Sequence, residues 1–301
     1  MNPKIIVLDD DPTGSQTVHS CLLLTRWDVA TLKAALADAA PLFFVLTNTR
    51  GMDAERAAAV TREVCTNLRA ALADYSGPVL FVSRSDSTLR GHYPVETDVM
   101  NEVLGPFDAT LLTPAFFEGG RVTRDSTHYL IVDGKPVPTH ETEFARDSVF
   151  GYRTAFLPDY VAEKTGGRVG ANSVRRLTLA DLRAGKTDTW LATLHDNAIG
   201  VVDGETPEDY RVFADAVLAS AAAGKRLLFR SAASLLTALA RLPPQPVAAE
   251  SFATLVRDGR PGVVVVGSHV AKTTAQLSAL LKERGVVGLP LNVARLPAER
   301  D

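Results

Sequence analysis

Short, continuously apolar runs alternate with helical patterns along this chain. In the first part, strand-like runs occupy residues 4–9, 20–25, 42–46, 79–82 and 109–113. Helical patterns lie between them at residues 28–40, 53–73 and 93–104. The apolar runs are uninterrupted rather than alternating with polar residues, as expected for strands covered on both faces. This arrangement predicts a doubly wound α/β fold with a mostly parallel sheet.

The rhythm breaks between residues 114 and 175, where glycine and proline recur at short intervals. We expect an irregular insert there, with short hairpins such as Tyr129–Val132. The α/β pattern then resumes, with helices predicted at 186–195, 207–223 and 232–239 and strands at 198–202 and 226–229.

A proline-rich segment separates this region from the last part of the sequence. Pro243-Pro244-Gln245-Pro246 begins it and Arg260-Pro261-Gly262 ends it, and such clusters mark linkers. Beyond it we predict a strand at 263–266, a helix at 270–284 and a strand at 286–293. One βαβ unit is too small to bury its own core. We therefore expect an α/β domain over residues 1–255 and the incomplete beginning of a second α/β domain over residues 256–301.

The composition is that of an ordinary globular protein. The 301 residues are 46% hydrophobic and carry a formal charge of −3, which gives no reason to expect nucleic acid or an anionic membrane as partner. Cys21 and Cys65 form neither a metal-type pair nor a disulfide framework, so we expect two reduced thiols. We find no signal peptide and no apolar run approaching the ~18 residues of a membrane span. The cytoplasm is the expected location.

Three consecutive acids follow the first predicted strand. Asp9, Asp10 and Asp11 precede Pro12-Thr13-Gly14, which favours a tight, shaped turn because Gly14 is free to adopt positive φ. In open parallel sheets, ligands bind outside the carboxyl ends of the strands. Several carboxylates placed together require cations, metal or hydrogen-bond donors. The loop is therefore a candidate ligand site, and a solvated turn with a helix cap is the simpler alternative.

A second polar loop follows the strand at 79–82. It runs from Ser83 to His92 and contains Arg84, Asp86, Ser87, Thr88 and Arg90. The two arginines can bind a carboxylate in bidentate fashion, and hydroxyls at the start of a helix favour anions. A capped helix start with exposed arginines is the alternative. Together the two loops predict a site for an anionic, hydroxylated small molecule.

The first loop also fits a different reaction. Asp9-x-Asp11-x-Thr13 after an apolar strand resembles the nucleophile loop of haloacid dehalogenase-like phosphatases, in which the first Asp would attack phosphorus. Phe43–Asn48 resembles the second motif of those enzymes. Their later lysine and paired acids have no convincing counterpart, because Asp203-Gly204-Glu205 is a poor match.

Ordered matches over nearly the whole chain resemble the four-carbon acid sugar kinase family. Asp10-Asp11-Pro12-Thr13-Gly14 is similar to the Asp-Asp-Leu-Thr-Gly motif of that family, and Asp86–Gly91 to its Asp-Ser-Thr-Leu-Arg-Gly motif. Further similar segments are Asn48–Arg50, Pro114–Phe116, Gly120–Thr123, Phe144–Asp147, Val202–Thr206 and Gly267-Ser268. The resemblance implies an ATP- and Mg²⁺-dependent kinase for acids of the threonate, erythronate or 3-oxo-tetronate type.

The resemblance also implies roles for individual residues. The N-terminal domain would bind the sugar acid, and Asp10 or Asp11 would orient or deprotonate its acceptor hydroxyl. The acid and its hydroxyls would be held by Asp9, Thr13, Gly14, Arg50, Arg84, Asp86, Ser87, Thr88, Arg90 and Arg121. The C-terminal domain would bind ATP, with Ser268 at the start of the nucleotide-binding half.

The sequence departs from the family pattern in places. Pro12 replaces the usual Leu, and Phe229–Ala233, which includes Arg230, stands where many members have Gly-Ser-Ala-Gly. Gly267–Thr274 does not complete a P-loop, because no Gly precedes Lys272. No histidines pair at metal-ligand spacing, so we expect no protein-held metal. His19 and His92 are further candidates for touching substrate.

A sugar-acid kinase is thus the leading hypothesis. A phosphatase and a non-catalytic sugar-acid-binding module remain as alternatives. The expected protein partners are a second copy of the chain or a separate C-terminal chain.

Overall fold

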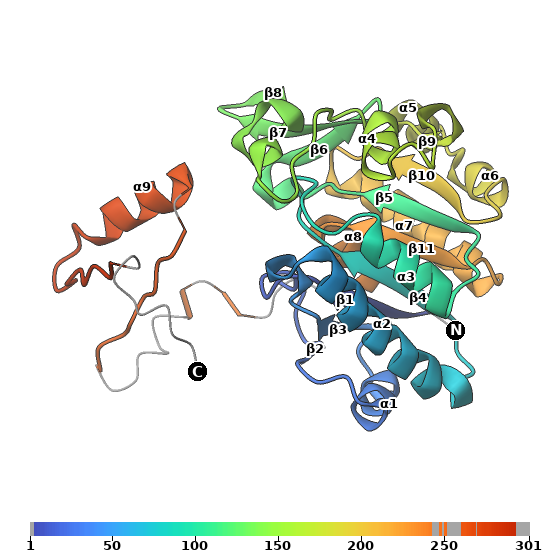
Figure 1. Cartoon of the computed structure of the whole chain (residues 1–301), viewed down its shortest axis with the longest axis horizontal. Coiled ribbons are helices and arrows are strands. Elements are labelled where there is room, and N and C mark those ends of the chain that lie inside the picture. Colours follow the sequence, from blue (N-terminus) through green and yellow to red (C-terminus); the bar gives the residue numbers. More distant parts are fainter. Residues whose placement is uncertain (1–2, 243–246, 249, 252–259, 269, 293–301) are drawn as a thin grey trace. The chain divides into compact units, whose positions relative to one another are not determined.

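The computed structural model describes residues 3–242, 247–248, 250–251, 260–268 and 270–292. The chain divides into two units, residues 1–246 and 247–301, which are described separately (Figure 1). The boundary expected at residue 255 lies outside the described residues.

An eight-stranded, wholly parallel sheet forms the centre of the first unit. Its strand order is β2-β3-β1-β4-β11-β5-β10-β9. The strands are β1 (Lys4–Asp9), β2 (Leu22–Leu24), β3 (Leu42–Leu46), β4 (Val79–Arg84), β5 (Ala109–Thr113), β9 (Arg175–Leu177), β10 (Ala198–Val202) and β11 (Leu227–Ser231). The chain passes from β1 to β2 and β3 on one side and then to β4 on the other. The order therefore reverses beside β1, and ligands bind parallel sheets at such a switch point.

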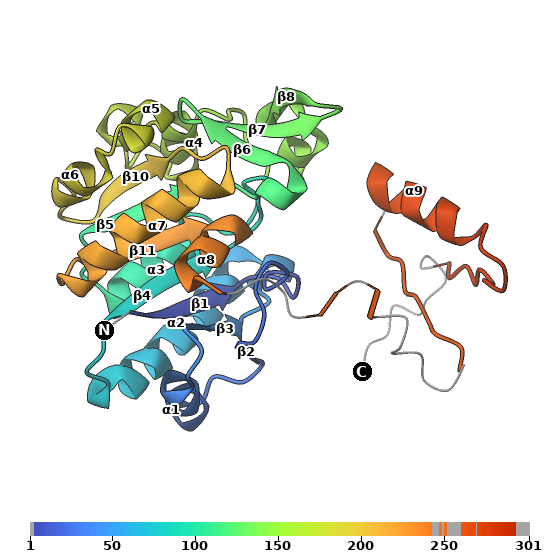
Figure 2. The same ribbon diagram turned by 180° about the vertical axis from the view of Figure 1, so that it is seen from behind.

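Helices cover both faces of this sheet, as Figures 1 and 2 show. One face packs against α1 (Val29–Ala37), α2 (Ala54–Ala71) and α3 (Val95–Leu104), and the other against α7 (Pro207–Ala222) and α8 (Ala233–Ala240). Alternate residues of β1 serve the two cores: Ile6 and Leu8 lie with α1–α3, and Ile5 and Val7 lie with α7 and α8. The doubly wound α/β prediction is confirmed.

The helices begin and end for local reasons that the sequence carries. The Asp53 side chain caps α2 by accepting from the backbone N–H of Arg56. At the start of α7, Thr206 and Asp209 form a reciprocal capping box around Pro207. Shorter helices α5 (Leu179–Arg183) and α6 (Thr187–Ala192) follow β9, so the helix predicted at 186–195 ends at Ala192.

The segment between residues 114 and 175 is more regular than predicted. It contains an antiparallel sheet of β6 (Arg121–Arg124), β7 (Thr127–Val132) and β8 (Lys135–Pro138), and helix α4 (Leu157–Lys164). The tight turns use residues with positive φ, among them Asp125, Ser126, Asp133 and Gly134. Such short strands between turns leave little periodicity in the sequence. The segment also contains short 3₁₀ turns η3 (Phe117–Gly119), η4 (Thr139–Glu141), η5 (Glu143–Arg146) and η6 (Ala171–Ser173). Two more, η1 (Thr49–Gly51) and η2 (Leu72–Asp74), lie earlier in the chain.

The described part of the second unit contains one α-helix, α9 (Ala271–Leu280), and no strand. The strand predicted at 263–266 is wrong, and so is the one predicted at 286–293 over its described residues 286–292. Val263 and Val265 are 89% and 88% exposed. A strand requires a neighbouring strand for its backbone hydrogen bonds, and no described residue supplies one there. The apolar run alone did not decide the structure.

Both cysteines are free thiols, as predicted. Burial raises the pKa of the Cys65 thiol to about 12, so it stays protonated at neutral pH. Within the described residues, no helix combines the length and apolar character that crossing a membrane requires.

Candidate active site

The carboxyl ends of β1 and β4 bring the two polar loops together. Asp9, the last residue of β1, pairs in register with Arg84, the last residue of β4. The backbone N–H of Thr47, just after β3, donates to the Asp9 carbonyl at 2.9 Å. Polar residues that follow separate strands in the sequence therefore share one edge of the sheet.

Asp10 is held on both carboxylate oxygens. Arg50 donates from Nη2 to Oδ1 at 2.5 Å and from Nε to Oδ2 at 3.2 Å. The Ser85 hydroxyl donates to Oδ2 at 2.7 Å. Burial lowers the pKa of Arg50, but the carboxylates of Asp10, Asp86 and Asp11 together outweigh this effect and the net pKa lies above its ordinary value. Asp10, 2% exposed, is thus fixed in a bidentate arginine pair.

Asp11 is less buried and more loosely bound. Its Oδ1 accepts from the Thr13 backbone N–H at 2.8 Å and from the Thr13 hydroxyl, while Arg50 Nη1 lies 3.2 Å from Oδ2. Burial raises the pKa of Asp11, but the Thr13 hydroxyl and Arg50 together bring it below the ordinary value. Arg50 therefore bridges two adjacent carboxylates and leaves Asp11 the more accessible of the two.

Asp9 and Arg84 differ from Asp10 and Asp11, because several of their polar side-chain atoms have no hydrogen-bond partner among the described residues. Asp9 is 0% and Arg84 4% exposed. Within the described residues, neither Asp9 Oδ atom, nor Nε or Nη1 of Arg84, has a hydrogen bond, and the closest approach of the pair is 3.6 Å between Nη1 and Oδ1. Burial raises the pKa of Asp9 to about 7, against the lowering effect of Arg84. Buried polar atoms without partners are rare in proteins, so they mark the Asp9–Arg84 pair as a candidate part of a ligand site.

Gly14 packs directly on the Asp9 carboxylate. A Cβ atom built at this position would lie 1.9 Å from Oδ1 and 2.0 Å from Oδ2. Gly14 is not among the glycines with positive φ, so the loop does not use its freedom to adopt that conformation. Glycine is required here by the close approach of backbone to carboxylate.

The loop after β4 is held in shape from the insert. Leu89 and Gly91 have φ values of 69° and 117°, and the carbonyls of three successive loop residues accept hydrogen bonds. The donors are His128 Nε2 to Ser87 at 2.7 Å, Tyr152 Oη to Thr88 at 2.7 Å and Tyr160 Oη to Leu89 at 2.8 Å. The insert is therefore a scaffold for this loop.

His128 is a structural histidine within that scaffold. Burial lowers its pKa to about 4, so the ring is neutral at pH 7. Since the Ser87 carbonyl can only accept, Nε2 carries the hydrogen, and Nδ1 accepts from the Thr123 hydroxyl at 2.9 Å.

Asp86 and Arg90 form a pair at the outer side of the loop. Arg90 Nε donates to Asp86 Oδ2 at 2.8 Å, and the Thr88 hydroxyl donates to the same oxygen. The Arg90 guanidinium lies 4.9 Å from the centre of the Phe144 ring. Burial raises the pKa of Asp86, but Arg90, Arg50 and the Thr88 hydroxyl together outweigh it and the net pKa is lowered. The pair is preformed, with 28% of the Arg90 side chain exposed.

Arg121 approaches the same region from the insert. Its Nη1 donates to the Gly119 carbonyl at 2.5 Å, and Nε is buried without a partner among the described residues. Burial lowers its pKa, with Asp86 opposing the shift and Arg90 adding to it. The charges of both Asp86 and Arg90 therefore act on Arg121.

Two functional candidates were missed by the sequence reasoning. Arg230 on β11 and Glu96 on α3 form a buried ion pair of 2.5 Å behind Ser85. An arginine inside the otherwise apolar run Leu227–Phe229 and an acid on the buried side of α3 were the available signals.

Other expectations fall outside this cluster. His92 is 6% exposed, and its Nε2 lies 3.1 and 2.9 Å from the carbonyls of Thr49 and Met52, so it ties η1 to the loop. His19 Nδ1 lies 3.0 Å from the Ser20 hydroxyl. Asp203 accepts from the backbone N–H groups of Ser126 and Leu179 at 2.8 and 3.1 Å, a structural junction. Ser268 is exposed in the second unit, where the Val270 N–H donates to its hydroxyl at 3.4 Å.

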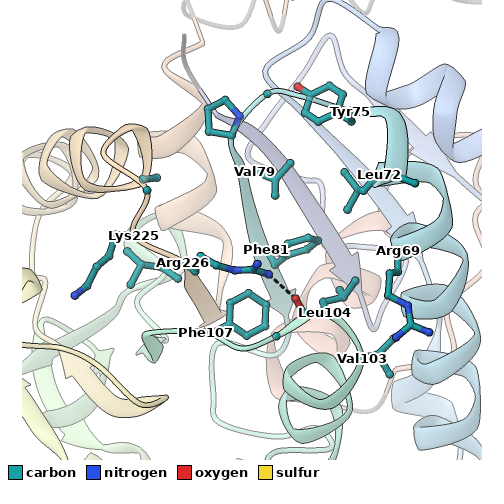
Figure 3. Close-up of a pocket in the computed structure, with 17 residues that line it drawn as sticks. Arg69, Leu72, Tyr75, Val79, Phe81, Val103, Leu104, Phe107, Lys225 and Arg226 are labelled. Carbon is teal, nitrogen blue, oxygen red and sulfur yellow. Dashed lines mark hydrogen bonds between the residues drawn. The ribbon is translucent and has the colours of Figure 1, made fainter.

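Cavities occur at both ends of the sheet. A cavity of about 20 Å³ lies at the carboxyl ends, bounded by Ser85, Asp86, Arg90 and Arg230 among others. A larger pocket of about 480 Å³, shown in Figure 3, includes Val79 and Leu227, the first residues of β4 and β11. It therefore lies at the amino ends of the strands, away from the acidic loop. In Figure 3 the Arg226 guanidinium already donates to the Leu104 carbonyl, at 2.5 Å.

The acidic loop is not built as a metal site. No group of three or more His, Cys, Asp or Glu side chains in the described residues could hold a metal ion. Asp10 and Asp11 are instead engaged by Arg50, Ser85 and Thr13.

Comparison with known proteins places this geometry in context. Residues 5–239 match the model of a sugar-binding N-terminal domain. A D-erythronate kinase of Heliobacterium modesticaldum is 29% identical over 287 residues, which are 92% of this chain and 60% of that protein. A D-threonate kinase of Bordetella bronchiseptica is 30% identical over 190 residues, 59% of this chain and 45% of that protein. The chain thus spans about half the length of the curated relatives that it matches.

Solved structures share the fold. A domain of unknown function from Bordetella bronchiseptica, crystallised with citrate as a domain-swapped dimer, is 26% identical with a TM-score of 0.57 and covers 80% of this chain and 57% of that one. A Haemophilus influenzae protein, 17% identical, has a TM-score of 0.54 and covers 78% of this chain and 55% of that one.

Proposed function

This chain belongs to the four-carbon acid sugar kinase family through its sugar-binding N-terminal domain, and on that premise we propose that it binds the sugar acid for ATP-dependent phosphorylation. The observation that carries the proposal is the meeting of four acids and three arginines after β1, β3 and β4: Arg50 pairs with Asp10 and Asp11, Arg84 faces Asp9, and Arg90 pairs with Asp86. The substrate would be a threonate, erythronate or 3-oxo-tetronate type acid.

Arginines would bind the carboxylate of the substrate. Arg84 has buried donor atoms without partners, and Arg90 and Arg121 lie on the insert side. A planar guanidinium matches a carboxylate geometrically. The bound citrate of the Bordetella structure, itself a hydroxylated carboxylate, agrees with this chemistry.

Acids and hydroxyls would bind the substrate hydroxyl groups. Asp9 offers two acceptor oxygens without partners in the described part of the chain. Asp86, Ser87 and Thr88 line the second loop, and Thr13 and Gly14 shape the first. Burying partnered polar groups against a ligand costs far less than burying them alone.

Catalysis would consist mainly of positioning. A carboxylate of Asp10 or Asp11 would orient the acceptor hydroxyl and take its proton as the oxygen attacks the γ-phosphorus of ATP and ADP departs. The geometry favours Asp11 for the contact, since the oxygens of Asp10 are occupied by Arg50 and Ser85. Mg²⁺ would neutralise phosphate charge when bound with the nucleotide. The described residues form no site of their own for Mg²⁺.

ATP would be bound mainly by the C-terminal half of such kinases, with Ser268 as the candidate contact in this chain. We also propose that the protein works in the cytoplasm. We propose that it forms an oligomer, because the Bordetella structures are domain-swapped dimers. Neither nucleic acid nor membrane is a proposed partner.

The two alternatives have less support. The phosphatase hypothesis needs a second acidic motif, and Asp203, its nearest candidate, is buried between backbone N–H groups. Mg²⁺-dependent hydrolysis of p-nitrophenyl phosphate without ATP would restore it. A non-catalytic binding module would show calorimetric binding of sugar acids without turnover in any form of the protein.

The decisive experiment is a thermal-shift screen of four-carbon sugar acids, with and without ATP. We expect one or a few acids to raise the melting temperature and the matching neutral polyols to have no effect. Stabilisation by polyols as much as by acids would contradict the proposal.

A further inference from the structure

A closed set of buried contacts lies behind the acidic loop. Arg230 is 8% and Glu96 4% exposed. Arg230 Nη1 donates to Glu96 Oε2 at 2.5 Å and to the Ser83 hydroxyl at 2.7 Å, and Nη2 donates to the Ser85 hydroxyl at 2.7 Å. The contacts join β11, α3 and β4.

The first arm of this set ends on Asp10 through Ser85. A guanidinium can only donate hydrogen bonds, so the Ser85 oxygen is the acceptor in its contact with Arg230. The Ser85 hydrogen must then point elsewhere. Its two acceptors are Asp10 Oδ2 at 2.7 Å and the Arg90 carbonyl at 3.0 Å. Arg230 therefore leaves the Ser85 hydrogen for these two acceptors, of which the Asp10 carboxylate is the nearer.

The second arm ends on the same carboxylate through Arg50. Glu96 Oε1 accepts from the Thr49 hydroxyl at 2.6 Å, and Thr49 is fully buried. The next residue, Arg50, donates its backbone N–H to the Asp10 carbonyl at 3.1 Å and its guanidinium to the Asp10 carboxylate. One ion pair thus reaches Asp10 from two directions.

The joint between the arms is closely packed. A Cβ atom at Gly91 would lie 2.4 Å from Ser85 Oγ, 2.7 Å from Arg230 Nη2 and 3.1 Å from Asp10 Oδ2. Gly91 also has a φ of 117°, which side chains rarely adopt. The backbone of the second loop therefore rests on the contact between Ser85 and Asp10.

Stability alone is a weak reason for such a pair. Replacing a buried ion pair by apolar residues is often neutral or stabilising, whereas its defined geometry sets the position of neighbouring groups. We propose that Arg230 and Glu96 are positioning residues, which hold Asp10 and the Arg50 clamp in place through Ser85 and Thr49. The inference rests on the proposed function, since it assigns these residues to the same site.

The test compares variants of the full-length protein. R230M/E96Q removes both charges together and leaves no buried charge alone. R230K keeps the charge, but a single ammonium group cannot reproduce the fork to Ser83, Ser85 and Glu96. S85A breaks the first arm only. R183M is the control, because Arg183 also forms an arginine–carboxylate pair, with Asp209 at 2.8 and 2.9 Å between α5 and α7, although its side chain is 50% exposed.

We expect R230M/E96Q, R230K and S85A each to lower kcat by about 10–100-fold, because displacing Asp10 and the Arg50 clamp would misplace Asp11, which Arg50 also contacts. KM for the sugar acid should change less than about threefold, because Arg230, Glu96 and Ser85 are buried and already bonded to protein groups. The kcat of the double variant R230K/S85A should fall no further than that of the worse single variant. R183M should keep the wild-type kcat. Unchanged kcat in R230M/E96Q, or losses in R230K and S85A that multiply, would overturn the inference.

A crystal structure of R230M/E96Q separates this inference from the proposed function. If wild-type protein phosphorylates no four-carbon acid, the proposed function fails, yet the positioning role is still read from the structure. The Ser85 Oγ to Asp10 Oδ2 distance, 2.7 Å in the native chain, should lengthen beyond about 3.5 Å, the limit of a hydrogen bond. An unchanged distance would refute the positioning role whatever the activity.

Discussion

Replacing Asp9 by asparagine should stabilise the first unit at alkaline pH, although it alters the candidate site. The folded protein buries the Asp9 carboxylate completely, and its oxygens have no hydrogen bonds in the described part of the chain. Asparagine has the shape of the protonated carboxyl group but never becomes charged. The variant therefore avoids the cost of burying an unpartnered charge.

The size of this stability effect follows from the pKa of Asp9. Burial raises the pKa of Asp9 from 3.8 to about 7. The folded state therefore binds more protons than the unfolded state between these values. The contribution of protonated Asp9 to the free energy of unfolding is complete below pH 3.8 and is lost as pH rises through 7. About three pKa units at ~1.4 kcal/mol each make the total loss roughly 4 kcal/mol.

Urea unfolding at pH 5 and pH 8.5 tests this directly. Trp27 and Trp190, the two tryptophans of the chain, both lie in the first unit and report its unfolding by fluorescence. The stability of D9N minus that of wild type should grow by about 3 kcal/mol between these pH values. This difference cancels any fixed packing change. D10N is the contrast: it breaks a paired carboxylate and should be destabilised at both pH values.

A stability difference between D9N and wild type that is the same at pH 5 and pH 8.5 would refute the reasoning. It would mean that Asp9 titrates in the folded protein as it does in the unfolded chain, so that its burial is compensated by contacts other than those described.

Further predictions concern binding and turnover. Arg90→Lys should weaken sugar-acid binding by about 1–3 kcal/mol in calorimetry, and equal affinity of wild type for erythritol and erythronate would remove the case for an arginine clamp. Gly14→Ala should lower the melting temperature and sugar-acid affinity, because its Cβ would lie 1.9 Å from Asp9 Oδ1, whereas Gly170→Ala, with nothing within 4 Å, should change neither. Asp11→Asn in the full-length kinase should lower kcat by ~10²–10⁴-fold with an unchanged circular dichroism spectrum, and near-full kcat would make the loop structural. Because the chain spans about half the length of its curated relatives, residues 1–301 alone should bind sugar acid but release ADP slowly, and turnover at ~1–100 s⁻¹ would contradict the proposal that ATP is bound mainly by the C-terminal half of such kinases.

Local sequence patterns determined the doubly wound fold. Continuous apolar runs such as Ile5–Leu8 are buried on both faces of the sheet, and caps such as Asp53 and Thr206 set the helix starts. These features act within a few residues, so they can be read from the chain directly. The placement of two polar loops after β1 and β4 was equally readable, because parallel strands share one carboxyl edge.

Local patterns failed where a partner was needed. Val263–Val266 has the composition of a strand but no paired neighbour in the described residues. Gly14 was assigned a backbone role, whereas its closeness to Asp9 is a tertiary contact. Short strands in the insert, such as Arg121–Arg124, exist because the neighbouring strand completes their hydrogen bonds.

Only the tertiary structure decided which charged groups are occupied and which are free. The sequence presents Asp9, Asp10 and Asp11 as three equivalent acids. In the fold, Arg50 and Ser85 engage Asp10, while Asp9 is left facing Arg84 without a hydrogen bond among the described residues. Arg230 and Glu96 meet across 134 residues of chain. Hydrogen bonding and desolvation depend on distances between groups remote in sequence, and packing of the whole sheet sets those distances.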